Sequence, residues 1–197
     1  MADERLRGLY VIIDPETARG RNGLEIAREA MEGGAQVIQL RDKRRSAQEL
    51  APTAEELRRV CRDLGALFIV NDDVNLAMAV GADGVHVGQR DMPVTEVRRL
   101  VPPEVIVGCS TNNVDEACRA ERDGASYVAV GRLYPTGSKP DTRPATLDTL
   151  RAVKAAVSVP VCAIGGINQS NIDEVIAAVV AAEDVRAAAR RLAERFG

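Results

Sequence analysis

The sequence predicts an α/β fold in which parallel strands are covered by helices, arranged as a barrel or as an open sheet. Short runs rich in β-branched residues alternate along the chain with longer stretches that have the period of an amphipathic helix. The strand-like runs are continuously apolar, which indicates that both faces of the sheet are buried. A chain of 197 residues with 46% hydrophobic residues can form one sizeable core, so we expect a single domain over residues 1–197.

Seven strands are expected, and in chain order they are GLYVIID, AQVIQL, LFIV, GVHV, EVIVGC, SYVAV and VPVCAI. Helical spacing fills stretches between them, including Leu24 to Met31, Leu50 to Leu64 and Leu147 to Val157. Ser46 is of the type that caps a helix N-terminus, and Gly-Ala pairs precede three of the strands, where a glycine ends the helix. Seven such units favour an α/β barrel, with a doubly wound open sheet as the alternative.

Composition narrows the class of function. The formal net charge of -3 is spread over stretches of mixed sign, so we expect small-molecule substrates and neither a nucleic-acid nor a membrane partner. The sequence contains no run of about 18 apolar residues and no apolar segment behind a basic N-terminal flank, which predicts a cytoplasmic protein. The four cysteines form no C-x-x-C pair, and we interpret them as reduced core thiols.

Polar residues follow the predicted strands at their carboxyl ends, where barrels and open α/β sheets both place their functional sites. In chain order these residues are Asp14, Gln39, Arg41, Lys43, Asn71, Asp72, Asp73, Gln89, Asp91, Ser110, Thr111, Thr136, Ser138, Lys139, Gly165 and Gly166. This edge is more polar than a passive rim requires, so we expect the site to lie there.

Two carboxylates of this edge are candidate metal ligands. Asp72 and Asp91 follow adjacent strands, and Mg²⁺ is typically held by one or two carboxylates together with substrate phosphate oxygens. The alternative is that Asp72 caps a helix and Asp91 belongs to a turn before Pro93. Their matched placement favours the metal pair.

Three cations of the same edge suit a diphosphate. Arg41, Lys43 and Lys139 offer one fork-shaped guanidinium and two ammonium groups. The alternative for the run RDKRRS is a solvated stretch of charges. Gln39 ends a buried strand and needs a partner, either a ligand or the neighbouring strand.

Two loops and one histidine complete the candidate site. The connection YPTGSKPDTRP is long for its type and rich in small polar residues, so it could close over an anionic ligand, or it is an ordinary surface loop. Gly165-Gly166, ahead of a helix that starts near Asn171, could let a phosphate approach backbone N–H groups. His86 is either a structural histidine or an acid or base, and we favour the structural role.

Six motifs in fixed order, QLRDK, VNDD, GVHVGQRD, GCS, YPTGSK and AIGGIN, resemble the thiamine-phosphate synthase family from about Tyr10 to Ile176. The resemblance implies a TIM (β/α)8 barrel and a transferase of thiamine biosynthesis. Such an enzyme joins 4-amino-5-hydroxymethyl-2-methylpyrimidine diphosphate to a thiazole phosphate, and it releases pyrophosphate and thiamine monophosphate. The reaction is dissociative and uses Mg²⁺, one ion per subunit. A homo-oligomer is left open.

The resemblance also assigns roles to residues. The pyrimidine diphosphate would contact Gln39, Arg41, Lys43, Asn71, Ser110 and Lys139. The thiazole phosphate would contact Thr136, Gly137, Ser138 and Gly166, and Asp72 and Asp91 would hold the metal. Arg41, Lys43, Ser110 and Lys139 would act in catalysis through electrostatic stabilisation, with no dedicated base. The chain departs from the family pattern at Asp73, Asn75 and Arg132, none of which is a proposed ligand.

Two other functions are left open. A related thiazole tautomerase shares the barrel but uses a histidine in the later part of the chain, and this sequence has no histidine after His86. The other alternative is a catalytically impaired barrel that only binds a thiamine precursor. Retention of the candidate cations and carboxylates favours diphosphate chemistry over tautomerisation.

The sequence further predicts that the eighth strand of the family barrel is missing. NIDEVIAA passes directly into VVAAEDVRAAARRL, and apolar residues keep helical spacing from Ile172 to Phe196. A strand and its turn, roughly ten residues, would be missing between Ala178 and Val179. We favour a segment left out of the sequence, since the last stretch resembles the family's final one. The alternative is a true deletion compensated by a gap, a partner subunit or distortion.

Overall fold

The computed structural model describes residues 6–16, 18, 20–135, 143–168, 170–172 and 174–175. Strands and helices alternate strictly within these ranges. In chain order they are β1 (Leu9–Ile13), α1 (Gly23–Glu32), β2 (Ala35–Leu40), α2 (Ala47–Asp63), β3 (Leu67–Asn71), α3 (Val74–Ala79), β4 (Gly84–Val87), α4 (Val94–Leu100), β5 (Ile106–Thr111), α5 (Val114–Arg122), β6 (Tyr127–Val130), α6 (Leu147–Ala156) and β7 (Val161–Ala163).

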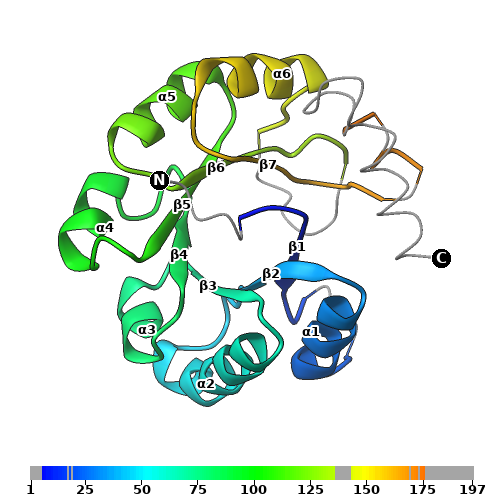
Figure 1. Cartoon of the computed structure of the whole chain (residues 1–197), viewed down its shortest axis with the longest axis vertical. Helices are drawn as coiled ribbons and strands as arrows, with labels where there is room; N and C mark the ends of the chain where they lie inside the picture. Colours follow the sequence, from blue (N-terminus) through cyan, green and yellow to red (C-terminus); the bar gives the residue numbers. More distant parts are fainter. Residues whose placement is uncertain are drawn as a thin grey trace.

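The strands form one parallel sheet in the order β1-β2-β3-β4-β5-β6-β7. Helices α1 to α6 follow one another around the outside of the strands (Figure 1). A doubly wound sheet reverses its strand order at a switch point, whereas this order runs straight through the chain. The barrel prediction is therefore confirmed, and the open-sheet alternative is wrong.

The barrel is not closed by the strands that the structure describes. In the described ranges β1 pairs with β2 and β7 pairs with β6, and no pairing joins β1 to β7. A cavity of about 540 Å³ is lined by residues of both strands, among them Tyr10, Ile12, Cys162 and Ala163. The Ala178–Val179 junction, where an eighth strand is expected to be missing, lies outside the described residues.

Buried apolar residues fall into two groups on opposite faces of the sheet. The larger group joins helix residues such as Leu57 to strand residues such as Phe68, so it fills the layer between helices and strands. The smaller group consists of strand residues and fills the barrel interior: Val37, Leu67, Ile69, Ile106 and Tyr127. Burial on both faces explains why the strands are continuously apolar.

Gly108 makes room for the largest of these interior side chains. A Cβ atom at position 108 would lie 2.2 Å from the ring of Tyr127, which faces it from the adjacent strand β6. Only glycine lets this ring cross the barrel interior at that height. The ring position places the Tyr127 hydroxyl 2.8 Å from both Tyr10 OH and His86 Nδ1.

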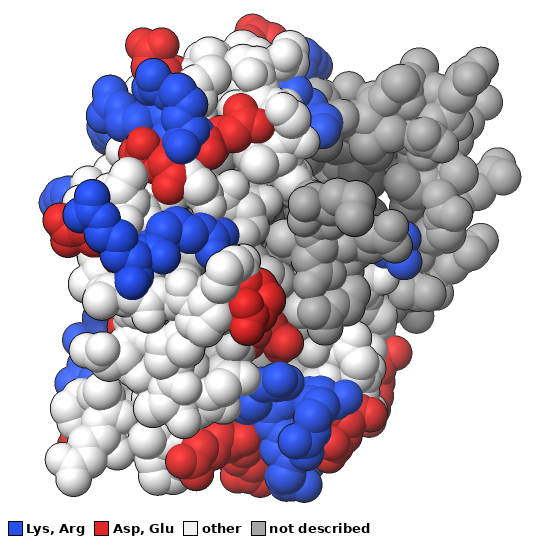
Figure 2. Space-filling model, turned by 60° about the vertical axis from the view of Figure 1, so that its left-hand side comes forward, with Lys and Arg blue, Asp and Glu red and all other residues white. Residues whose placement is uncertain are grey.

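The outer surface carries charges of both signs. On the face shown in Figure 2, Lys and Arg side chains are interspersed with Asp and Glu side chains and with uncharged areas. In the described part of the chain, no helix combines the length and the apolar character needed to cross a membrane.

Candidate active site

The carboxyl ends of the strands bring together, at one edge of the barrel, the predicted site residues that the structure describes. The backbone N–H of Arg41 donates to Ile13 at the end of β1, and that of Asp72 donates to His86 in β4. Each residue just past a strand is thus held against its neighbour by the ladder of the parallel sheet. This arrangement places the loops after β1, β2, β3 and β4 side by side.

Arg41 is buried at this edge and paired with Asp14. The guanidinium Nη1 donates to the Asp14 carboxylate, and the two residues are only 7% and 5% exposed. The Nε atom of Arg41 is buried and has no hydrogen-bond partner among the described residues. A buried N–H without an acceptor is rare in folded proteins, because leaving it unpaired costs about 1–3 kcal/mol.

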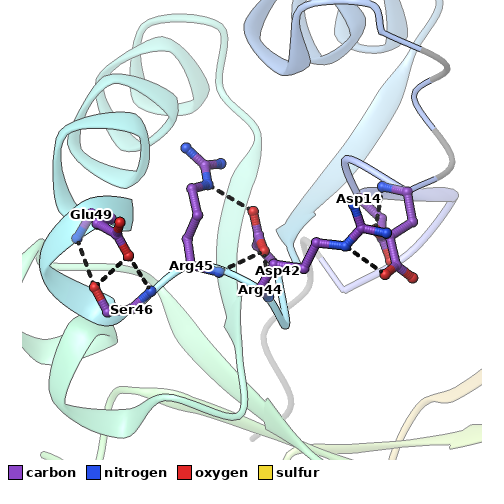
Figure 3. Close-up of polar contacts among 7 residues, drawn as sticks. Asp14, Asp42, Arg44, Arg45, Ser46 and Glu49 are labelled. Carbon is purple, nitrogen blue, oxygen red and sulfur yellow. Dashed lines mark hydrogen bonds and ion pairs between the residues drawn. The ribbon is translucent and has the colours of Figure 1, made fainter.

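The other charges of RDKRRS behave differently from Arg41. The Asp42 carboxylate accepts from the backbone N–H groups of Arg44 and Arg45 and from Arg45 Nε at 2.8 Å (Figure 3). Burial acts to raise the pKa of Asp42, but these hydrogen bonds outweigh it and lower the pKa. Arg44 is exposed and pairs with Glu16. The solvated-run interpretation therefore fits Arg44 and fails for Arg41.

Helix α2 begins immediately after this loop and fixes where the loop ends. Ser46 accepts from the backbone of Glu49, and the Glu49 carboxylate accepts in return from the backbone of Ser46 (Figure 3). This reciprocal pair satisfies two N–H groups at the first turn. The helix start expected at Ser46 is confirmed.

Lys43 turns toward the candidate metal carboxylates. Its Nζ lies 3.0 Å from Asp72 Oδ2. Burial raises the pKa of the Asp72 carboxyl, the neighbouring Asp91 carboxyl raises it further, and Lys43 acts in the opposite direction. The two carboxylates are therefore close enough to repel each other, as ligands of one cation are.

Asp72 does not cap the following helix. Asp73 does so, since its Oδ1 accepts from Leu76 N at 2.8 Å. Asp72 has φ of 64°, in the left-handed region that a residue with a side chain seldom adopts, and such conformations cluster at functional sites. Asp91 does take part in its turn, because Oδ2 accepts from Gly88 N at 2.8 Å. The capping alternative was wrong for Asp72, and the turn interpretation of Asp91 is confirmed alongside its closeness to Asp72.

Gln39 finds its partner on the neighbouring strand. It is 2% exposed, and its Nε2 donates to the hydroxyl of Tyr10 at 2.8 Å. On the opposite side of the interior, Ser110 Oγ lies 2.9 Å from His86 Nε2. Gln89 Nε2 donates to the Ser110 carbonyl at 2.8 Å and so steadies that residue. Asn71 ends β3 directly beside His86 in the register of the sheet.

The Gly165-Gly166 turn packs tightly against the start of the loop after β6. Gly166 has φ of +65°, and a Cβ there would lie 2.7 Å from the Pro135 carbonyl. Tyr134 N donates to Gly165 O at 3.0 Å, which ties the two segments together. Thr136, Gly137, Ser138 and Lys139 lie outside the described residues.

Asn112 is a residue of this edge that the sequence did not single out. Its Nδ2 donates to the carbonyls of Gly131 and Arg143, at 2.6 and 2.7 Å, and so ties together the two stems of the loop after β6. Glu116 supports it, accepting from Asn112 N and from Arg143 Nη2. Tyr10 and Tyr127 were also not identified from the sequence as site residues. The signal that could have indicated them is that two of the three tyrosines fall inside predicted strands.

Comparison with known proteins agrees with this geometry. The family model described as thiamine monophosphate synthase matches residues 9–188. A thiamine-phosphate synthase of Methanospirillum hungatei is 46% identical over 95% of this chain and 96% of its own length, and that of Moorella thermoacetica is 48% identical over 94% of each. The solved structure of thiamine phosphate pyrophosphorylase from Pyrococcus furiosus superposes with a TM-score of 0.80 at 36% identity, covering 94% of this chain and 96% of that one.

The family model matches residues 9–188, which is most of this chain, and the two relatives are nearly half identical to it. This chain therefore belongs to the thiamine monophosphate synthase family.

Proposed function

We propose that this chain joins 4-amino-5-hydroxymethyl-2-methylpyrimidine diphosphate to a thiazole phosphate, with release of pyrophosphate and thiamine monophosphate. One observation carries the proposal. At a single edge of the barrel, the cations Arg41 and Lys43 lie beside the carboxylates Asp72 and Asp91 in a chain that belongs to the family. Such an edge can bind a diphosphate and a divalent cation together.

The carboxylates fit Mg²⁺. Asp72 and Asp91 supply hard oxygen ligands from adjacent strand ends, and the ammonium group of Lys43 lies 3.0 Å from Asp72. Asp72 and Asp91 would hold the ion, with the remaining ligands supplied by water and diphosphate oxygens. When bound, Mg²⁺ neutralises charge on the departing diphosphate.

Arg41 binds the diphosphate from the β2 side of the edge. Its buried Nε without a partner and its fork of donors are suited to two oxygens of one phosphate. The Asp14 carboxylate accepts from Nη1, so the guanidinium is oriented before the substrate arrives. Lys43 adds a second positive charge, and in the bound state its ammonium group can move from Asp72 to the diphosphate.

Ser110 and Gln39 lie at opposite sides of the same edge and contact the pyrimidine diphosphate. Asn71, at the end of β3, and Lys139 complete this subsite. The thiazole phosphate is held by Gly166 together with Thr136, Gly137 and Ser138. The leaving diphosphate gains negative charge as the C–O bond breaks, and fixed cations stabilise this charge without reorganisation. No proton needs to be removed from carbon, so no general base is required.

The test is a titration of both substrates with pyrophosphate release as the readout. Turnover is expected only when both substrates and Mg²⁺ are present. Arg41→Ala and Asp91→Ala are each expected to lower kcat/KM by at least about a hundredfold. Arg44→Ala is the matched control, since Arg44 belongs to the same loop but pairs with Glu16, and it should stay within about twofold of the wild type.

Two outcomes would overturn the proposal. Isomerisation of the thiazole without pyrophosphate would indicate a tautomerase. Binding of the pyrimidine diphosphate without turnover would indicate an impaired barrel.

A further inference from the structure

A continuous series of hydrogen bonds crosses the interior of the barrel and ends at Ser110. It runs from Gln39 Nε2 to Tyr10 OH, from there to Tyr127 OH, and on to His86 Nδ1, each step being 2.8 Å long. The last step joins His86 Nε2 to Ser110 Oγ at 2.9 Å. The five side chains come from five different strands, β2, β1, β6, β4 and β5, so the sheet itself holds the series in place.

The first donor of the series is fixed, because Gln39 Nε2 can only donate and the Tyr10 oxygen therefore accepts from it. The Tyr10–Tyr127 and Tyr127–His86 contacts can each form in either direction. In the order that continues the direction of the first donor, Tyr10 donates to Tyr127, and Tyr127 donates to His86 Nδ1. In this order Nδ1 carries no proton, and the ring proton of His86 is on Nε2, facing Ser110.

Burial keeps the two phenols in the protonated form that this order needs. Tyr127 is 2% exposed, and burial raises its pKa well above the ordinary value for tyrosine. Burial likewise raises the pKa of Tyr10, with smaller opposing effects from its hydrogen bonds. Gly108 leaves the space through which the Tyr127 ring reaches both partners.

We propose that Tyr10, Tyr127 and His86 are positioning residues that fix His86 as the Nε2–H tautomer and so turn the Ser110 hydroxyl into a donor toward bound diphosphate. Because Ser110 Oγ accepts from His86, its own proton points away from His86. The diphosphate offers only acceptors, so a serine held as a donor suits it. The claim that Ser110 donates to a diphosphate rests on the proposed function, whereas the claim about the His86 tautomer does not.

The geometry assigns His86 no direct role on the substrate. Both ring nitrogens are within hydrogen-bond distance of protein groups, Tyr127 on one side and Ser110 on the other, and the residue is 6% exposed. A histidine held in this way orients a neighbour and does not exchange protons with a ligand. The structural role expected for His86 would thus be to orient the Ser110 hydroxyl.

The tautomer can be measured directly, because His86 is the only histidine. Protein labelled with ¹⁵N-histidine and carrying no affinity tag gives one pair of imidazole signals in long-range ¹H–¹⁵N spectra. We expect a protonated Nε2 and an unprotonated Nδ1 at neutral pH. Tyr127→Phe should give a mixture of the Nε2–H and Nδ1–H tautomers. If Tyr127→Phe does not fold, Tyr10→Phe is measured in its place. An Nδ1–H tautomer or an imidazolium in the wild type would overturn the inference.

The link to the ligand is tested by a double-mutant cycle on the dissociation constant of the pyrimidine diphosphate, measured by calorimetry. Ser110→Ala should weaken binding at least about tenfold, and Tyr127→Phe about three- to tenfold. In the Ser110→Ala background Tyr127→Phe should have no further effect, because the series acts only through Ser110. His86→Gln, which keeps a donor near the Nε2 position, should bind better than His86→Leu.

The outcomes separate the two ideas. A wild-type protein that binds the diphosphate while the two substitutions act additively would overturn the positioning role and leave the proposed function intact. A wild-type protein that does not bind the diphosphate would overturn the proposed function, while the tautomer would still be decided by the spectra.

Discussion

The ammonium nitrogen of Lys43 lies 3.0 Å from Oδ2 of Asp72, so the loop after β2 and the end of β3 meet through opposite charges. The same Asp72 carboxyl lies near Asp91, which raises its pKa in addition to the larger effect of burial. The ammonium group of Lys43 thus already places one positive charge beside this carboxylate pair. This is the arrangement expected where a divalent ion and a diphosphate later share the charge.

Asp91→Asn is expected to stabilise the protein without Mg²⁺ and to abolish its response to Mg²⁺. The pKa of Asp72 is higher in the folded state than in the unfolded state. Above the folded-state pKa, the ionised carboxylate therefore lowers the free energy of unfolding. This loss of stability disappears as the pH falls below the pKa of Asp72 in the unfolded chain. Removing the Asp91 charge should therefore add about 0.5–1 kcal/mol near pH 7.5, with the gain shrinking toward pH 4. Urea unfolding across this pH range measures it. Glu55→Gln, at an exposed position of α2, is the control, and an equal gain there would contradict the prediction.

Asp14→Asn should cost about 3 kcal/mol, because it leaves the buried Arg41 guanidinium without its countercharge. The double variant Asp14→Asn/Arg41→Met should recover part of this loss while remaining inactive. Urea unfolding of the three proteins measures the difference. Glu29→Gln breaks the exposed pair with Arg21 and should cost less than about 1 kcal/mol. A similar cost at both positions would show that the Arg41 pair is not buried in solution.

Gly108→Ala should destabilise the barrel by about 1–3 kcal/mol, since the added Cβ would lie 2.2 Å from the Tyr127 ring. The imidazole signals of His86 should change as well, because the Tyr127 hydroxyl must shift. Gly33→Ala is the matched control, since Gly33 has φ of -75° and a Cβ there would lie no closer than 3.3 Å to its neighbours. If both substitutions cost the same, steric contact with the ring is not the cause.

Alkylation by iodoacetamide at pH 8 should spare Cys61 and Cys109, which are buried. Burial raises the pKa of Cys61 to about 12 and that of Cys109 to about 11, so roughly one thousandth or less of each is thiolate at this pH. Cys118 is half-buried and should be modified before either of them. Peptide mass spectrometry after timed quenching gives the order, with urea-unfolded protein as the control for complete modification. Fast labelling of Cys109 in the folded protein would contradict the prediction.

The missing strand can be tested by weighing the protein isolated from its natural host. If a segment has been left out of the sequence, the intact mass should exceed 21.1 kDa by the mass of roughly ten residues, the length of a strand and its turn. A mass equal to that of the 197 residues would instead establish a true deletion. In that case pyrophosphate release by the same preparation would show whether seven described strands suffice for turnover.

Strand and helix order could be predicted because it depends on local periodicity, and the edge that carries the site could be predicted because parallel strands end on the same side. The seven strands lie where β-branched runs are, and Asp72 follows β3 as expected. Six short motifs in a fixed order were enough to identify the family, since each motif is a contiguous stretch that can be recognised in the sequence. The roles assigned to individual site residues stay predictions.

Other features depend on partners far away in the sequence, and these only the tertiary structure decided. Within RDKRRS, Arg41 alone is buried against Asp14, because β2 lies beside β1. Tyr10 and Tyr127 are 117 residues apart, yet their hydroxyls are 2.8 Å apart, because a ring of strands brings the first near the sixth and Gly108 leaves the space. The sequence by itself thus determined which residues follow the strands at the carboxyl edge, whereas the curving of the strands around a common interior decided which of the described residues are buried and which are paired, and it brought His86 Nε2 within 2.9 Å of Ser110 Oγ.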